Sequence, residues 1–126
     1  MSDERAKLAL VVDDEDMVRD LLCVSLEEAG LTVLSAADGA QAKKAFDEHA
    51  AEIRLVLLDL NMPDIGGGEL YDALVAYDSP AKYVLVSGYP ERDARERFGR
   101  EGLAGFLQKP FRIDALIDLA RDLVDG

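Results

Sequence analysis

The amino-acid sequence predicts an α/β fold in which five β-α units build a three-layer sandwich around a parallel sheet. Two observations favour this fold. Short continuous apolar runs, typical of strands buried on both faces of a parallel sheet, alternate along the chain with segments of helical periodicity. The chain has 126 residues, which accommodates five such units, whereas a TIM barrel needs about twice the length.

Five apolar runs are expected to be the strands. Right-handed crossovers between parallel strands leave few arrangements, and five consecutive units favour the flavodoxin-like order 2-1-3-4-5. This order places a binding crevice at the carboxyl ends of strands 1 and 3. The five runs are Leu8–Val12, Leu31–Ser35, Ile53–Leu58, Tyr83–Ser87 and Ala104–Leu107.

Helical spacing follows each of these runs. Gly30 stands where a left-handed residue follows the first helix, and Asp38 is expected to cap the second. Pro90 suits the first turn of the fourth helix, because the N–H that it lacks would be unpaired there. The second to fifth helices are expected to cover Asp38–His49, Gly68–Tyr77, Pro90–Arg100 and Ile113–Val124. The expected inward-facing residues are Val18, Leu21, Leu22, Ser25 and Ala29 in the first helix, and Ile113, Leu116, Ile117, Ala120 and Val124 in the last.

Composition excludes several classes of function. The net charge of −12 argues against direct binding of nucleic acids or anionic membranes, which require Lys and Arg. A single cysteine, Cys23, and a single histidine, His49, exclude an internal disulfide and a structural zinc site. No apolar run approaches the ~18 residues of a membrane span. We therefore expect one cytoplasmic domain over residues 1–126, with its core at about 8–124.

Polar side chains follow four of the expected strands. Asp13 and Asp14 follow the first strand, Asp59 the third, Ser87 ends the fourth and Lys109 follows the fifth. Because the carboxyl ends of parallel strands meet at one edge of the sheet, these groups are expected to converge. Carboxylates that lie close together repel unless one is protonated or a cation lies between them, and Mg²⁺ prefers oxygen ligands. The pattern indicates a magnesium site.

The same residues suit phosphoryl transfer. The carboxylate of Asp59 is a competent nucleophile toward phosphorus. A metal ion, the Lys109 ammonium and the Ser87 hydroxyl would each take one equatorial phosphoryl oxygen, and such charge neutralisation is most of what this chemistry needs. Taken singly, each residue also has a plain structural interpretation: Asp14 as the cap of the first helix, Lys109 as a solvated lysine and Ser87 as a turn residue.

Four motifs lie at the ends of the expected strands: Val11-Val12-Asp13-Asp14-Glu15, Leu57-Leu58-Asp59-Leu60-Asn61-Met62-Pro63, Val86-Ser87-Gly88-Tyr89 and, within Phe106-Leu107-Gln108-Lys109-Pro110-Phe111, Lys109-Pro110-Phe111. In their order and spacing, they resemble the receiver domain of two-component response regulators, over about residues 8–124. The sequences around the last two motifs are also similar to those of receivers joined to hybrid histidine kinases.

The resemblance implies a metal site and a phosphoacceptor. Asp59 would accept the phosphoryl group from a phosphohistidine of a histidine kinase or a histidine phosphotransfer protein. Mg²⁺, or Mn²⁺ in its place, would be bound directly by Asp14, Asp59 and the backbone carbonyl of Asn61, and through water by Asp13. The domain would catalyse only its own phosphorylation and dephosphorylation, and is not expected to be an enzyme with turnover.

The resemblance also implies a switch. Ser87 would be the switching hydroxyl, Lys109 the phosphate-binding ammonium, and Phe106 the aromatic residue that turns inward once Ser87 is drawn to the phosphoryl group. The Lys109-Pro110 peptide would be cis, and Gly67 matches the glycine after the Met-Pro turn. The change would reach a downstream effector through the face formed by the fourth helix, fifth strand and fifth helix.

Other functions remain open at this point. One is an interaction module that works without phosphorylation, whose signature would be the loss of Asp59, Lys109 or the acidic pair; the sequence has all of them. Another is a phosphohydrolase with an aspartyl nucleophile, which would need a second acid where Asn61 stands. A nucleotide-binding α/β protein fits less well, since strand 1 leads into acids rather than a glycine loop.

Overall fold

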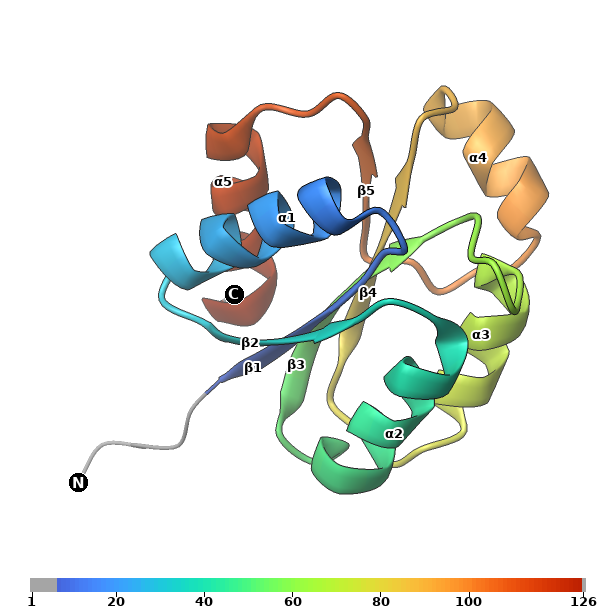
Figure 1. Cartoon of the computed structure of the whole chain (residues 1–126). Coiled ribbons are helices and arrows are strands. Elements are labelled where there is room, and N and C mark those ends of the chain that lie inside the picture. Colours follow the sequence, from blue (N-terminus) through green and yellow to red (C-terminus); the bar gives the residue numbers. More distant parts are fainter. Residues whose placement is uncertain (1–6, 126) are drawn as a thin grey trace.

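The computed structural model describes residues 7–125 and has the expected three-layer architecture (Figure 1). Five parallel strands form one sheet in the order β2-β1-β3-β4-β5, which confirms the predicted topology. The elements are β1 (Leu8–Val12), α1 (Asp16–Glu28), β2 (Thr32–Ala36), α2 (Gly39–His49), β3 (Ile53–Asp59), α3 (Gly67–Val75), β4 (Lys82–Ser87), α4 (Glu91–Phe98), β5 (Gly105–Gln108) and α5 (Ile113–Asp125).

Helices cover both faces of the sheet and divide the core into two layers. One layer lies between the sheet and α2, α3 and α4, and the other between the sheet and α1 and α5. Strand β1 contributes to both, with Leu10 in the first layer and Ala9 and Val11 in the second, because successive side chains of a strand point to opposite faces. Within residues 7–125, no helix has the length and apolar character needed to cross a membrane.

Strand β2 differs from its predicted form. It runs one residue later than predicted, and burial on both faces is wrong for it: Thr32 and Ser35 are exposed and Val33 is half-buried. The reason is topological, since β2 lies at the edge of the sheet and pairs with β1 alone. Strand β3 starts where predicted and ends one residue later, so that it includes Asp59. Strand β4 starts one residue earlier than predicted, and β5 runs one residue later.

The buried faces of α1 and α5 are rotated from those predicted. In α1, Leu22 and Ser25 are buried as expected, but Leu21 is 42% exposed and Leu26 is fully buried instead. In α5, Leu116 and Ala120 are buried, whereas Ile113 is 45% exposed at the start of the helix. Apolar spacing in a leucine-rich helix fits two overlapping faces, and packing against the sheet selects one of them.

The helix ends are set by local backbone chemistry. Asp38 caps α2 as predicted, accepting the N–H of Gln41 at 2.8 Å. Gly30 follows α1 with φ 96°, in the left-handed region, also as predicted. Pro90 is the N-cap residue of α4 and lies outside its first turn, since its ψ of 151° is extended. Gly99, with φ 70°, ends α4 earlier than predicted, and α3 likewise ends at Val75.

Two substitutions in α5 test which face of this helix is buried against the sheet. Leu116→Ala removes a fully buried side chain and is expected to lower the free energy of unfolding by about 2–5 kcal/mol. Ile113→Ala, its matched control in the same helix, is expected to lower it by less than about 1 kcal/mol because Ile113 is half exposed. Urea unfolding of both variants measures the difference, and equal losses would contradict the orientation of α5.

Candidate functional site

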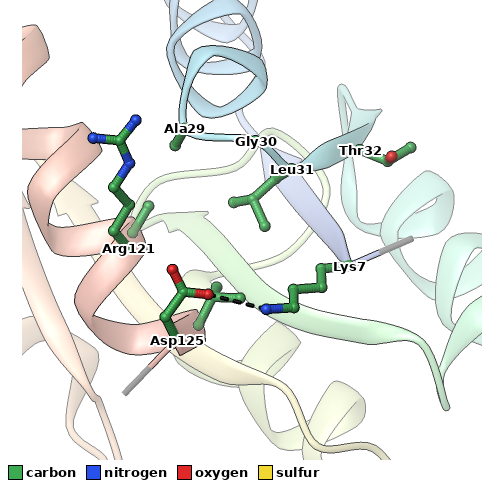
Figure 2. A pocket seen from close by; sticks show the side chains of 9 residues that line it. Lys7, Ala29, Gly30, Leu31, Thr32, Arg121 and Asp125 are labelled. Carbon is green, nitrogen blue, oxygen red and sulfur yellow. Dashed lines mark hydrogen bonds and ion pairs between the residues drawn. The ribbon is translucent and has the colours of Figure 1, made fainter. Parts of the chain in front are cut away.

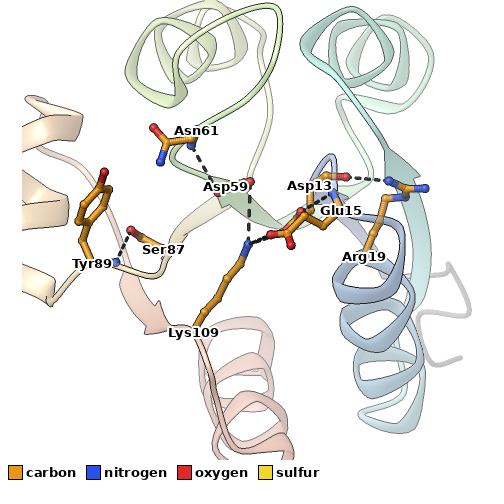
Figure 3. Close-up of polar contacts among 8 residues, drawn as sticks. All are labelled: Asp13, Glu15, Arg19, Asp59, Asn61, Ser87, Tyr89 and Lys109. Carbon is orange, nitrogen blue, oxygen red and sulfur yellow. Dashed lines mark hydrogen bonds and ion pairs between the residues drawn. The ribbon is translucent and has the colours of Figure 1, made fainter.

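The carboxyl ends of four strands bring the predicted polar residues to one edge of the sheet. Asp13 directly follows β1, Asp59 ends β3, Ser87 ends β4 and Lys109 directly follows β5. Figure 3 shows the Lys109 ammonium between Asp59 and the acids that follow β1, whereas the Ser87 hydroxyl points toward the backbone N–H of Tyr89. Asp59 pairs in register with Val86 of β4, so that the ends of β3 and β4 lie side by side. The convergence therefore follows from the strand order.

Three carboxylates form a compact acidic cluster. One oxygen from each of Asp13, Asp14 and Asp59 lies within 4.8 Å of the others. Asp13 is fully buried and Asp59 nearly so, while Asp14 is exposed. Backbone N–H groups hold two of them: Glu15 donates to Asp13 Oδ1 at 2.9 Å, and Asn61 donates to Asp59 Oδ1 at 3.3 Å. The cluster therefore offers only oxygen ligands. The backbone holds Asp13 and Asp59 in place, and Asp14 is exposed to solvent.

Lys109 supplies the positive charge beside this cluster. Its Nζ lies 3.0 Å from Asp13 Oδ2, 3.1 Å from Glu15 Oε1 and 4.0 Å from Asp59 Oδ2. The ammonium is thus held more closely by the acids that follow β1 than by Asp59 (Figure 3). Its backbone N–H donates to the carbonyl of Ser87 at 2.8 Å, which ties this residue to the end of β4.

The crowding of charge shifts two pKa values. Burial, together with the neighbouring charge of Asp13, raises the pKa of Asp59 to about 7, even though Lys109 opposes the change. Burial alone would lower the pKa of Lys109, but its hydrogen bond to Asp13 and the charge of Asp59 raise it overall. Lys109 therefore stays protonated, and the negative charge of the cluster is only partly balanced.

Ser87 lies beside the cluster at the end of β4. Its side chain is buried, and Oγ accepts the N–H of Tyr89 at 3.0 Å, which orders the turn that follows. The ring of Tyr89 packs under the guanidinium of Arg97 on α4, with 4.1 Å between the guanidinium carbon and the ring centroid. The turn that carries the hydroxyl is therefore linked to α4.

The remaining predicted residues lie around this edge. Asn61 follows β3 by two residues, and Phe106 lies on β5, half-buried against the core layer that contains α4. The Lys109-Pro110 peptide is cis, as expected. The alternative role of Asp14 as the cap of α1 is wrong, since Glu15 is the N-cap residue and no side chain caps that helix.

Two contacts at the site were not predicted from the sequence. Glu15 shares the Lys109 ammonium with Asp13, although it had been assigned no role. Arg19 of α1 donates from Nη1 to the backbone carbonyl of Asp13 at 2.8 Å and from Nη2 to Asp16 at 2.6 Å. Their sequence signal was weak, because a charged residue in the first turns of a helix is ordinarily solvated.

A cavity lies at the end of the sheet opposite to the acidic cluster. It has a volume of about 260 Å³ and is bounded by the starts of β1 and β2 and the ends of α1 and α5 (Figure 2). Lys7 and Asp125 pair across it at 3.0 Å, and among residues 7–125 Asp125 is the sole carboxylate that lines it. Because the described lining of this cavity offers one carboxylate, which already pairs with Lys7, the acidic cluster is the stronger candidate for chemistry.

Comparison with known proteins agrees with this geometry. Residues 9–121 match the family model described as the response regulator receiver domain. The sensor kinase CckA of Brucella abortus (strain 2308) is 32% identical over 116 residues, which cover 92% of this chain and 12% of CckA. The chemotaxis protein CheY of Halobacterium salinarum is 27% identical over 119 residues, which cover 94% of this chain and 98% of CheY. The chain thus spans a small part of the kinase and nearly all of CheY.

A solved structure shows the same likeness in three dimensions. The receiver domain of NtrX from Brucella abortus superposes with a TM-score of 0.82 at 31% sequence identity, covering 94% of this chain and 98% of that one. The family model spans most of the chain, and the strand order is the one that the sequence predicts for this fold. The chain belongs to the response regulator receiver domain family of two-component signalling systems.

Proposed function

We propose that this receiver domain accepts a phosphoryl group on Asp59 from a phosphohistidine of a histidine kinase or a histidine phosphotransfer protein. The observation that carries the proposal is the convergence of three carboxylates and one ammonium at a single edge of the sheet. The relatives of the chain include a sensor kinase and a transcriptional regulator. They support a kinase as the source of the phosphoryl group and an effector protein or domain as its readout.

The donor set of the acidic cluster fits a hard divalent cation. It offers only oxygen atoms, and burial together with the negative charge of Asp13 raises the pKa of Asp59 to about 7, which a bound cation would counteract. We assign Asp14, Asp59 and the backbone carbonyl of Asn61 as direct ligands of Mg²⁺ or Mn²⁺, and Asp13 as a ligand through water. When bound, the cation neutralises charge on the carboxylates and on the phosphoryl oxygens.

The residues of this chain supply the remaining chemistry. An oxygen of the Asp59 carboxylate forms a bond to phosphorus while the P–N bond of the phosphohistidine breaks, and the electron pair of that bond stays on the imidazole nitrogen. No general base is needed, because an ionised carboxylate is already nucleophilic. We assign the Lys109 ammonium and the Ser87 hydroxyl to phosphoryl oxygens, which requires Lys109 to move toward Asp59 from Asp13 and Glu15.

The proposed readout is the face formed by α4, β5 and α5. Ser87 moves toward the phosphoryl group and Phe106 turns inward, and the change spreads to α4 through the turn that carries Tyr89. Only Ala94 and Phe98 of α4 are buried, so that this helix is held weakly compared with the strands of the sheet. The domain acts on itself alone, through its own phosphorylation and dephosphorylation.

Substitution of Asp59 tests the phosphoacceptor. Incubated with a small acyl-phosphate donor and Mg²⁺, the wild-type protein is expected to gain the mass of one phosphoryl group, because the donor P–O bond is replaced by a bond to the Asp59 carboxylate. Asp59→Asn is expected to gain none, and excess chelator should abolish the adduct in the wild type. Asp118→Asn, an exposed position on α5, is the matched control and should react normally. An adduct on Asp59→Asn would favour a different acceptor.

The raised pKa of Asp59 predicts a pH-dependent stability. The folded state holds this proton up to about pH 7, whereas an unfolded aspartate loses it near pH 4, so the stability from the protonated form falls as pH rises between these values. Asp59→Asn removes the penalty and is expected to be more stable than wild type by about 1–4 kcal/mol at about pH 8, with little difference near pH 4.

Thermal unfolding at several pH values measures this effect. Mg²⁺ should stabilise the wild type at the higher pH and have little effect on Asp59→Asn, whereas Asp118→Asn should follow the wild type throughout. A constant difference between Asp59→Asn and wild type across the pH range would mean that burial of the Asp59 charge is not the cause.

Hydrogen exchange tests the proposed switch. Phosphorylation is expected to change amide exchange in residues 87–106, which include the Ser87 turn, α4 and Phe106, more than in α1, because few buried side chains hold α4 in place. Mass spectrometry of the protein before and after phosphorylation gives the comparison. An equal or larger change in α1 would contradict the proposed route.

A further inference from the structure

The loop that follows Asp59 is anchored by its own backbone at the base. Asn61 and Gly66 form an isolated antiparallel bridge, and Gly67 N–H donates to the carbonyl of Leu60 at 2.9 Å. A Cβ on Gly67 would lie 2.9 Å from that carbonyl oxygen, so the glycine permits this close return of the chain. The base of the loop is thus closed, and its tip consists of Asp64 and Ile65.

The tip is fastened to the start of α2. Asp64 Oδ1 accepts the N–H of Gly39 at 2.9 Å, and Oδ2 accepts the N–H of Ala40 at 3.2 Å. The first N–H groups of a helix have no partner within it, and a carboxylate there is favoured by the helix dipole. The hydrogen bond from Gly39 accordingly holds the pKa of Asp64 below its usual range. A Cβ on Gly39 would overlap Ile65, so this close approach requires glycine.

Helix α2 also has its own N-cap residue, Asp38, which accepts a different backbone N–H group. Asp38 accepts the N–H of Gln41 at 2.8 Å, whereas Gly39 and Ala40 donate to Asp64. The turn before α2 leads back to Ala36 at the end of β2, whose carbonyl accepts the N–H of Asp13 at 3.1 Å. The two sides of the acidic cluster, Asp13 and the loop after Asp59, are therefore joined through the start of α2.

We infer that Asp64 is a positioning residue, which holds the Asn61 loop against the start of α2 and so fixes the backbone carbonyl of Asn61 beside the acidic cluster. The inference rests on the proposed function, since it assigns that carbonyl to the metal. Asp64 is not among the proposed ligands of the metal or of the phosphoryl group. Its two hydrogen bonds restrict the loop before any ligand binds, and without them the loop must be ordered when Mg²⁺ binds.

Mg²⁺ affinity of the unphosphorylated protein tests the inference. Isothermal titration with MgCl₂ is expected to show binding by Asp64→Ala that is about 10- to 100-fold weaker than by wild type, as for other residues that orient metal ligands. Asp38→Ala is the matched control: it removes the other cap of the same helix turn and should bind Mg²⁺ within about twofold of wild type. In the metal-free proteins, amide exchange of residues 61–66 should accelerate in Asp64→Ala but not in Asp38→Ala.

A second variant tests the same contact by a substitution at the start of α2. Gly39→Ala favours the helical state but adds a Cβ that overlaps Ile65, so it is expected to weaken Mg²⁺ binding although it does not weaken α2 itself. The inference is overturned if Asp64→Ala binds Mg²⁺ as tightly as wild type, or if Asp38→Ala weakens binding equally. Failure of the wild type to bind Mg²⁺ would instead overturn the proposed metal site, so the two failures can be told apart.

Discussion

Mutual repulsion among three carboxylates is the constraint on which the functional edge of this protein depends. Asp13, Asp14 and Asp59 place oxygens within 4.8 Å of one another, with one ammonium, that of Lys109, beside them. Such an arrangement is unfavourable in the absence of a cation, and burial together with the neighbouring charge of Asp13 raises the pKa of Asp59. It persists because the strands that carry these acids are fixed by the core on both faces. The carboxylates that the proposed chemistry requires therefore lower the stability of the folded protein.

The packing around this edge is uneven in a way that suits signalling. Every residue of β1 is buried, and β3 is nearly as well covered, so the acids at their ends have a firm base. On the other side of Asp59, α4 is short, highly charged and held by two buried side chains. The Ser87 turn joins the two regions through the stacked pair of Tyr89 and Arg97. Rigid acids and a loosely held helix thus lie within one small domain.

The periodicity of apolar residues predicts the strand order and, through it, the residues that meet at the acidic cluster. Strand order follows from the alternation of elements, and once it is known, Asp13, Asp59 and Lys109 must approach one another, although 46 and 50 residues separate them along the chain. The faces of helices were less well defined, because leucine-rich spacing allowed Leu21 where the structure buries Leu26. The contacts of Glu15 and Asp64 depend on loop conformation. The pattern of apolar residues does not predict which ammonium or backbone N–H groups a carboxylate in a loop will contact.

The contact between Asp64 and the start of α2 also constrains how such domains can be recombined. Its two halves lie 25 residues apart, yet the carboxylate, the glycine at position 39 and Ile65 fit together as one joint. A loop grafted from a relative with a different residue at position 64 would leave backbone donors of α2 unpaired, and a donor helix with a side chain at position 39 would collide with Ile65. Chimaeras of this domain therefore need positions 39, 64 and 65 to be transplanted as a unit.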